Sequence, residues 1–253
     1  MSAFAPGSRA WPLPRWIAHR GAGKLAPENT LAAFRLGAQY GYRAFECDVK
    51  LSADGVPYLM HDATLDRTTS GSGPAADLSW DRLSRLDAGS WHGRSHAGEP
   101  LPSFEAVARY CLCNQFELDL EIKPIPGTEE HTGAVVAAEV MRLWHGEQRR
   151  PMLSTFKPAA LQGAMEREPG LQRALLLDEL WDGWDAAAQR LGCSAIITDF
   201  QMMDAALIQH LHARGWAAGV YTVNEPADAA RMVGLGVAGI VTDAVDRFSP
   251  AAP

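Results

Sequence analysis

The chain has 253 residues, a net charge of −7 and a composition that is 47% hydrophobic and 21% charged, which is typical of a globular protein. It has no block of basic residues, and this argues against nucleic acid or an anionic membrane surface as its main partner. It also has no apolar run of about 20 residues and no amino-terminal signal-peptide pattern, so we expect a cytoplasmic protein without stable membrane association.

Eight short apolar runs alternate with helical patterns along the chain, and such alternation is typical of a parallel sheet. Eight repeats in about 250 residues favour a single domain, residues 1–253, folded as a closed (β/α)₈ TIM barrel. The alternative is an open Rossmann-like sheet, but the first strand does not open into a GxGxxG turn. The predicted strands are residues 16–19, 44–51, 117–122, 151–156, 173–178, 194–199, 217–223 and 238–243.

The second strand is followed by a feature that breaks this rhythm. The dipeptide DG at 54–55 predicts a hairpin, with a second short strand that runs to His61. Residues 63–102 then form an insertion rich in Gly, Ser and Pro. In barrels such insertions lie over the carboxyl ends of the strands, where active sites form. The predicted helices are residues 30–40, 103–113 with Ser103 as N-cap, 133–146, 158–167, 182–191, 203–214 and 226–234.

Two predicted strands carry acidic residues on one face. Glu46 and Asp48 are two residues apart, so their side chains point to the same side of the strand. Two neighbouring carboxylates on a buried strand face repel each other unless a cation lies between them. The alternative is a solvent-exposed strand face with scattered acids, which the apolar flanking residues argue against.

The segment ELDLEIK alternates in the same way and places Glu121 and Lys123 towards the end of its strand. Taken alone, it is more typical of an amphipathic edge strand with a solvent-exposed face. Together with the first pair, Glu121 completes a set of three carboxylates. Three oxygen ligands without His or Cys favour Mg²⁺ or Ca²⁺ over zinc. Such a cation would neutralise a phosphate oxygen and stabilise charge at phosphorus.

Two histidines, His19 and His61, end strands at the same predicted rim. Two groups that titrate near neutral pH on either side of a phosphorus atom suit general acid–base catalysis. A lone histidine at a strand end is more often structural, so this hypothesis depends on the pair and on the carboxylates beside it. Arg20 and Lys123 are placed to bind the remaining phosphate oxygens.

The segments that carry these residues are IAHRGAGKLAPENTLAAF, ECDVKLSADGVPYLMHDATLDRTTSGSG, LPSFEAV, ELDLEIK and VYTVN. Together, and in this order, they resemble the glycerophosphodiester phosphodiesterase family in its short cytoplasmic bacterial form. Each motif alone is weak, but HRG, ExD, HD and ExK in combination are specific. The resemblance implies a (β/α)₈ barrel with a small insertion after the second strand. It also implies hydrolysis of small glycerophosphodiesters to an alcohol and sn-glycerol 3-phosphate.

The resemblance also implies site residues. It predicts that Glu28 and Asn29, in the PENT element, support the rim, and that Glu28 orients Arg20. Many family members have Trp at the position of Tyr221, which would lie near the glycerol part of the substrate together with Phe156. The other implied roles are acid–base catalysis by His19 and His61, binding of one Mg²⁺ or Ca²⁺ by Glu46, Asp48 and Glu121, and phosphate contacts by Arg20 and Lys123.

Other functions are weighed against this interpretation. A lysophospholipase D-type enzyme would use the same site on a lipid substrate, but no apolar docking segment is evident. A catalytically silent barrel that binds glycerophosphodiesters should have lost a catalytic histidine or a metal carboxylate, and none is missing. A metal-dependent amidohydrolase would need an HxH pair on the first strand, where this chain has AHRG. The head-group preference and the oligomeric state are not predicted.

Overall fold

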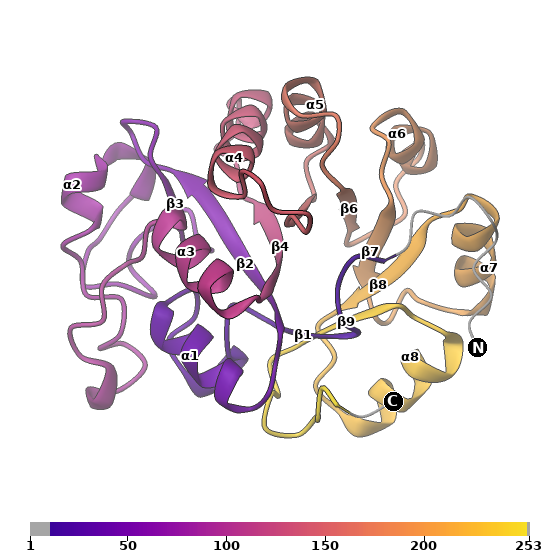
Figure 1. Cartoon of the computed structure of the whole chain (residues 1–253), viewed down its shortest axis with the longest axis horizontal. Coiled ribbons are helices and arrows are strands. Elements are labelled where there is room, and N and C mark those ends of the chain that lie inside the picture. The colour runs from indigo at the N-terminus through magenta and orange to yellow at the C-terminus, as the bar shows by residue number, and fades with distance from the viewer. Residues whose placement is uncertain (1–10, 252–253) are drawn as a thin grey trace.

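The computed structural model describes residues 11–251, and its centre is a closed barrel of parallel strands (Figure 1). The first strand pairs with both the second and the last, so the sheet has no free edge in the barrel. This closure confirms the predicted TIM barrel and rules out the open sheet. The strands are β1 (Trp16–Ala18), β2 (Ala44–Leu51), β3 (Pro57–Leu59), β4 (Glu117–Ile122), β5 (Met152–Thr155), β6 (Arg173–Leu177), β7 (Ala195–Asp199), β8 (Ala217–Tyr221) and β9 (Gly239–Thr242).

The barrel strands are apolar on both faces because both faces are buried. Outward side chains such as Phe45, Cys47 and Val49 of β2 pack against the surrounding helices. Inward side chains such as Leu176 and Ile197 fill the lower barrel. The inward face of β2 instead carries carboxylates, so the polar side chains are concentrated at one end of an otherwise apolar interior.

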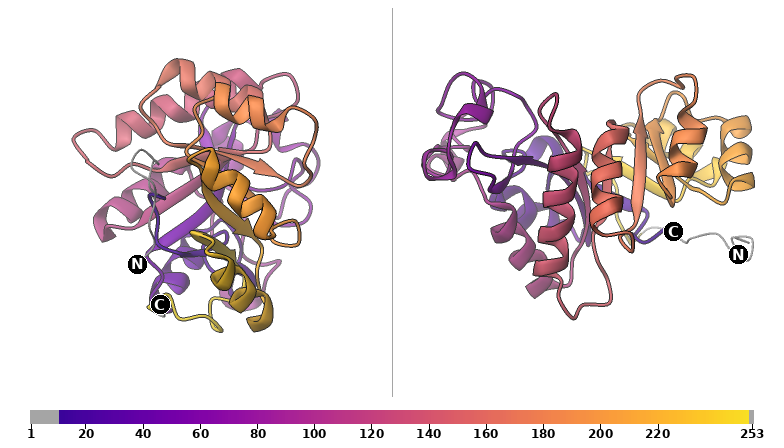
Figure 2. Two further views of the ribbon diagram at one scale, coloured as in Figure 1. Left: turned by 90° about the vertical axis from the view of Figure 1, so that its right-hand side faces the viewer. Right: turned by 90° about the horizontal axis from the view of Figure 1, so that it is seen from above.

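Helices cover the outside of the barrel (Figure 2). The predicted N-cap of the second helix is confirmed, since the Ser103 hydroxyl accepts a hydrogen bond from the backbone N–H of Ala106. The helix predicted from residue 133 begins earlier, at Glu129. The prediction started too late because the first turn of this helix is polar and carries no apolar periodicity. The helices are α1 (Leu31–Gln39), α3 (Phe104–Asn114), α4 (Glu129–Leu143), α5 (Pro158–Arg167), α6 (Trp184–Arg190), α7 (Ala205–Ala213) and α8 (Pro226–Leu235).

The predicted hairpin and insertion follow β2. Strand β3 pairs antiparallel with β2, and residues 63–102 then form a lobe at the edge of the molecule, on the left in Figure 1. The lobe has a small core that includes Leu65, Leu83 and Leu101 and packs against Tyr58 of β3. Its short helices are η2 (Ala75–Asp77), α2 (Trp80–Leu83) and η3 (Arg94–His96); the turn after β1 holds η1 (Gly23–Leu25).

Among the described residues, no helix combines the length and the apolar character that a membrane span requires.

Candidate active site

The predicted site residues gather around one pocket at the carboxyl ends of the barrel strands, which we call the mouth. The pocket has a volume of about 240 Å³. Phe156 follows β5 and Tyr221 ends β8, so the wall of the pocket comes from both halves of the chain. Of the nine predicted residues, only Asp48 does not line the pocket, because it is fully buried beside it. The other eight are His19, Arg20, Glu46, His61, Glu121, Lys123, Phe156 and Tyr221.

The three predicted metal ligands meet because of the register between β2 and β4. Asp48 lies directly opposite Glu121 in this parallel pair, and Glu46 is two residues below Asp48 on the same face. One carboxylate oxygen from each of the three lies within 4.8 Å of the others. Glu46 Oε1 and Asp48 Oδ1 are buried and accept no hydrogen bond from any residue in the described part of the chain. This oxygen-only donor set suits Mg²⁺ or Ca²⁺.

Burial and mutual repulsion perturb these carboxyl groups. Burial, followed by the charges of Asp48 and Glu121, raises the pKa of Glu46. Burial and the Asp48 charge raise the pKa of Glu121 to about 7. Burial alone would raise the pKa of Asp48 too, but the nearby charges of Arg20 and Lys123 lower it to about 2. Asp48 is therefore ionised beside two carboxyl groups whose ionisation is disfavoured, and a divalent cation would relieve this repulsion.

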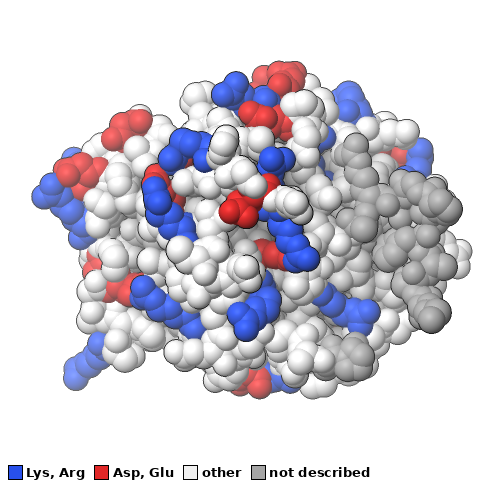
Figure 3. Space-filling view, viewed as in Figure 1, with Lys and Arg blue, Asp and Glu red and all other residues white. Residues whose placement is uncertain are grey.

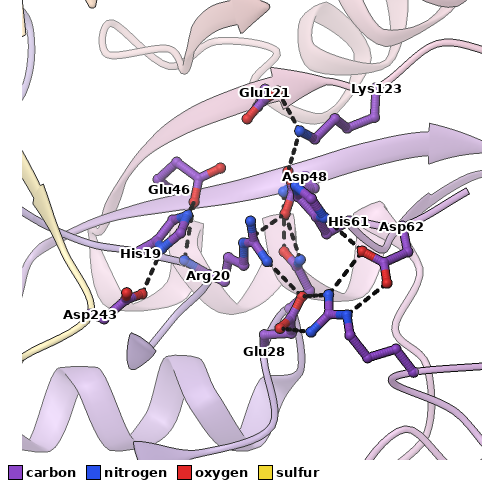
Figure 4. Close-up of polar contacts among 12 residues, drawn as sticks. His19, Arg20, Glu28, Glu46, Asp48, His61, Asp62, Glu121, Lys123 and Asp243 are labelled. Atoms are coloured by element: carbon purple, nitrogen blue, oxygen red, sulfur yellow. Dashed lines mark hydrogen bonds and ion pairs between the residues drawn. The ribbon is translucent and has the colours of Figure 1, made fainter. Parts of the chain in front are cut away.

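Two cationic side chains flank this cluster (Figure 4). Lys123 Nζ lies 2.7 Å from Glu121 Oε1 and 3.5 Å from Asp48 Oδ1. Arg20 Nε lies 3.3 Å from Asp48 Oδ2, and the Arg20 backbone N–H donates to Glu46 Oε2 at 3.1 Å. Both cations line the pocket and are mostly buried, so they carry positive charge to the place where a phosphate would lie.

His19 contacts a carboxylate that comes from the other end of the chain. Ala18 of β1 lies opposite Thr242 of β9, so the next residues, His19 and Asp243, leave the barrel side by side. His19 Nδ1 is 2.6 Å from Asp243 Oδ1, while its Nε2 lies 3.7 Å from Glu46 Oε2 (Figure 4). Because a carboxylate only accepts, Nδ1 carries the hydrogen and Nε2 is directed to the pocket side.

Asp243 is itself held in place. Its backbone N–H donates to Asn224 Oδ1 at 2.8 Å, and the Asn224 amide donates to Asp243 Oδ2 at 3.2 Å. The turn after β1 runs against the Asp243 backbone, where a Cβ on Gly23 would lie only 2.1 Å from the Asp243 carbonyl oxygen. Glycine at this position therefore permits the close approach that places His19 beside its carboxylate.

His61 is oriented in a similar way, but by its neighbour in sequence. His61 Nδ1 is 2.8 Å from Asp62 Oδ1. The Asp62 carboxylate is held in turn by Arg67, a residue of the insertion, whose Nε donates to Asp62 Oδ2 at 2.6 Å. Burial lowers the pKa of His61, while the Asp48 charge raises it and only partly compensates. His61 is therefore mainly neutral near pH 7, with Nε2 free to accept a proton.

The PENT residues support the rim as predicted. The Asn29 amide donates to Asp48 Oδ2 at 2.8 Å, and Asn29 Oδ1 accepts from the Asp48 backbone N–H at 3.1 Å. Glu28 Oε1 accepts a hydrogen bond from Arg20 Nη1 at 2.8 Å. Asn29 thus holds a metal-ligand candidate, and Glu28 orients Arg20, the contact that the resemblance implies.

Two aromatic rings form another part of the pocket wall. Phe156 and Tyr221 pack edge to face with their centroids 5.7 Å apart. The Tyr221 hydroxyl donates to the backbone oxygen of Leu177 at 3.1 Å, so it is turned towards the barrel wall. Lys123 Nζ lies 5.7 Å from the centre of the Phe156 ring. The pocket therefore has an apolar side next to its charged side.

A family model described as the glycerophosphoryl diester phosphodiesterase family matches residues 19–247. The chain belongs to this family. The match begins at His19, and it includes all of the predicted site residues. The family and the phosphodiesterase activity predicted from the sequence motifs are thereby confirmed.

Individual members of the glycerophosphodiester phosphodiesterase family are similar to this chain over nearly their whole length. A curated glycerophosphodiester phosphodiesterase from Caldanaerobacter subterraneus is 32% identical over 90% of this chain and 93% of its own. A solved phosphodiesterase from Oleispira antarctica, in complex with the product sn-glycerol 3-phosphate, is 31% identical with a TM-score of 0.88, covering 93% of this chain and 95% of its own. A family structure from Agrobacterium tumefaciens is 30% identical, with a TM-score of 0.80 and coverage of 94% and 99%.

Sequence reasoning about this phosphodiesterase missed the groups that hold the two histidines. Asp62 stands in the HD element, but no role follows from the dipeptide itself. Asp243 ends one predicted strand and Asn224 directly follows another, and polar residues at strand ends were a usable signal. Arg67 lies in an insertion without periodic pattern, so only the three-dimensional structure brings it to the site.

Proposed function

We propose that this enzyme hydrolyses glycerophosphodiesters to an alcohol and sn-glycerol 3-phosphate, with one divalent cation held by Glu46, Asp48 and Glu121. The observation that carries the proposal is a single pocket faced by an oxygen-only carboxylate cluster, two carboxylate-backed imidazoles and two cationic side chains. The relative from Oleispira antarctica, which binds sn-glycerol 3-phosphate, supports this choice of product.

The metal proposal rests on the donor set. Glu46 Oε1 and Asp48 Oδ1 are buried oxygens without a hydrogen-bond donor among the described residues, and Glu121 lies beside them. We propose Mg²⁺ or Ca²⁺, since both prefer oxygen ligands. When bound, such an ion supplies positive charge that stabilises the charge developing on the phosphate oxygens. Arg20 and Lys123 would bind the phosphate oxygens that remain.

His19 and His61 would act as the acid–base pair. Each imidazole has its Nδ1 on a carboxylate, so each would exchange its catalytic proton through Nε2. One Nε2 takes the proton of the attacking hydroxyl as the new oxygen–phosphorus bond forms. The other gives a proton to the oxygen of the departing alcohol as its bond to phosphorus breaks. Family resemblance points to the glycerol 2-hydroxyl as the first nucleophile, giving a cyclic phosphate that water then opens.

The aromatic side of the pocket would receive the glycerol part of the substrate. Phe156 and Tyr221 offer ring surface, and the Tyr221 hydroxyl is already satisfied by Leu177. A small phosphodiester suits the pocket volume of about 240 Å³. On the face of the molecule in Figure 3, acidic and basic side chains are interspersed, so local rather than bulk charge would attract the substrate. We also propose that the enzyme acts in the cytoplasm, as expected from the sequence.

The test is release of glycerol 3-phosphate from glycerophosphocholine and glycerophosphoethanolamine with Mg²⁺, with Ca²⁺ and with EDTA. We expect release with at least one metal and none with EDTA. Undiminished release in EDTA would refute the metal-binding role of the three carboxylates and leave the reaction standing. Lysophosphatidylcholine is assayed in parallel, because faster turnover of this lipid would favour the lysophospholipase D-type alternative.

A further inference from the structure

Arg67, in the insertion, connects the segment after β3 with the turn after β1. Its guanidinium donates through Nε and Nη2 to Asp62, at 2.6 and 2.9 Å. It also donates through Nη1 and Nη2 to Glu28, at 2.7 and 2.8 Å. A guanidinium group has five N–H donors in a fixed planar arrangement. Four of them are used here, and together they fix the planes of two carboxylates.

Each of these two carboxylates orients a residue that lines the pocket. Asp62 Oδ1 is shared between Arg67 and His61 Nδ1, which lies 2.8 Å away. Glu28 Oε1 is shared between Arg67 and Arg20 Nη1, also at 2.8 Å. A continuous path of hydrogen bonds therefore runs from one proposed acid–base catalyst to one proposed phosphate-binding residue, and Arg67 is its midpoint.

The position of Arg67 is fixed by its own segment of the insertion. Leu65 is buried in the small core of the insertion, and its backbone N–H donates to the carbonyl of Gly73 at 2.9 Å. The Thr69 hydroxyl donates to the Leu65 carbonyl at 2.7 Å, and Asp66 accepts from the Gly73 backbone at 3.0 Å. The guanidinium thus extends from a turn that is tied down on both sides.

Charge explains why an arginine is needed at this point. The Arg67 hydrogen bonds lower the pKa of Asp62, so Asp62 stays ionised opposite His61. Glu28 is ionised as well, because the hydrogen bond from Arg67 and the charge of Arg20 outweigh the effect of burial on its pKa. Without Arg67, the carboxylates of Asp62 and Glu28 would repel each other with no cation between them. We expect both to rotate away, which would change the orientations of His61 and Arg20.

We propose that Arg67 is a positioning residue that sets the orientation of His61 and Arg20 together, and that this is one function of the insertion. Arg67 is not among the described residues that line the pocket. It therefore acts through Asp62 and Glu28 rather than on the substrate. The inference rests on the roles proposed above for His61 and Arg20. It predicts that turnover depends on a side chain that is 45% exposed and lies outside the barrel.

The test compares Arg67→Ala and Arg67→Lys with the wild-type enzyme on glycerophosphocholine at saturating metal. A matched control is Arg85→Ala, because Arg85 lies in the same insertion and is also paired with an aspartate, Asp81, but neither residue lines the pocket. For Arg67→Ala we expect kcat to fall on the order of 10²-fold, as for a displaced catalytic group, with a smaller change in KM. Arg67→Lys should recover little, since an ammonium group cannot hold two carboxylates bidentately. Arg85→Ala should match the wild type.

Two further measurements separate positioning from a loss of stability. Guanidinium chloride at millimolar concentration should restore part of the kcat of Arg67→Ala, because the free cation can occupy the space between Glu28 and Asp62. In a Glu28→Gln/Asp62→Asn background, Arg67→Ala should lower kcat by less than threefold, since the residues through which it acts are already neutral. Thermal unfolding of all variants is recorded alongside.

The outcomes distinguish this inference from the proposed function. Activity of Arg67→Ala within threefold of wild type, or an equally large loss in the Glu28→Gln/Asp62→Asn background, would overturn the positioning role. If His61→Ala keeps near-wild-type activity, the proposed acid–base role itself fails, whatever Arg67→Ala does. A large loss in His61→Ala with a wild-type Arg67→Ala would refute only the inference on Arg67.

Discussion

Replacing Asn29 by glycine should both destabilise the enzyme and weaken its metal binding. The Asn29 amide makes two buried contacts with Asp48, one to the carboxylate at 2.8 Å and one from the backbone N–H at 3.1 Å. A hydrogen bond to a charged group contributes about 1.5–3 kcal/mol and a neutral one about 1 kcal/mol, so the loss is about 3 kcal/mol. Asn29 has a φ of 58°, which glycine adopts without the strain that alanine would add.

The assay has two arms, unfolding and metal titration. For a chain of this size, about 3 kcal/mol lowers the melting temperature by roughly 6–12 °C. Loss of a group that orients a metal ligand should weaken Mg²⁺ or Ca²⁺ binding about 10- to 100-fold in calorimetric titration. The control is Asn114→Ala, which removes one exposed hydrogen bond to the Tyr110 carbonyl and should change neither quantity appreciably. An Asn29→Gly enzyme with unchanged melting temperature and unchanged metal affinity would refute the reasoning.

Three further predictions concern the histidines, the aromatic wall and acid stability. Replacing either His19 or His61 by alanine should lower kcat at least about 10²-fold, and near-full activity in steady-state assays would contradict the acid–base assignment. Tyr221→Phe removes only the hydrogen bond to Leu177, so calorimetry should find a loss of about 1 kcal/mol while kcat/KM stays within about threefold. Burial would raise the pKa of Asp243, but its hydrogen bond with His19 lowers it overall, so this carboxylate stabilises the fold above its unfolded pKa of about 3.9. The melting-temperature difference between wild type and Asp243→Asn should therefore be largest near neutral pH and shrink as the pH falls below about 4, and a difference that grows in acid would reverse the assigned sign.

The barrel and its ligand cluster could be predicted because both depend on local alternation. Glu46 and Asp48 share one face of β2 for the simple reason that strand side chains alternate, and the same period directs Glu121 into the barrel on β4. The order of the strands in the sheet then follows from short right-handed connections, so β2 and β4 had to be neighbours once the hairpin was recognised. No long-range information was needed for this part of the site.

The partners of the histidines could not be predicted in the same way. His19 and Asp243 are 224 positions apart and meet only because β1 and β9 close the barrel in one particular register. Arg67 is reached through an insertion whose turns follow from individual hydrogen bonds rather than from a repeating pattern. The start of α4 was misplaced for a related reason, since its first turn, at Glu129, carries no apolar periodicity.

Strands and loops contribute different kinds of residue to this site. The candidate metal ligands stand on β2 and β4, where backbone pairing on both sides holds them rigidly and where the pKa of Glu46 is raised by burial. The groups that orient the histidines, Asp243 and Arg67, stand in loops that pack against the mouth from outside. A substitution in a strand therefore disturbs both the cluster and the core, whereas a substitution in a loop can change the orientation of an imidazole and leave the barrel intact. For this reason, variation in the insertion should alter turnover more readily than it alters metal binding or stability.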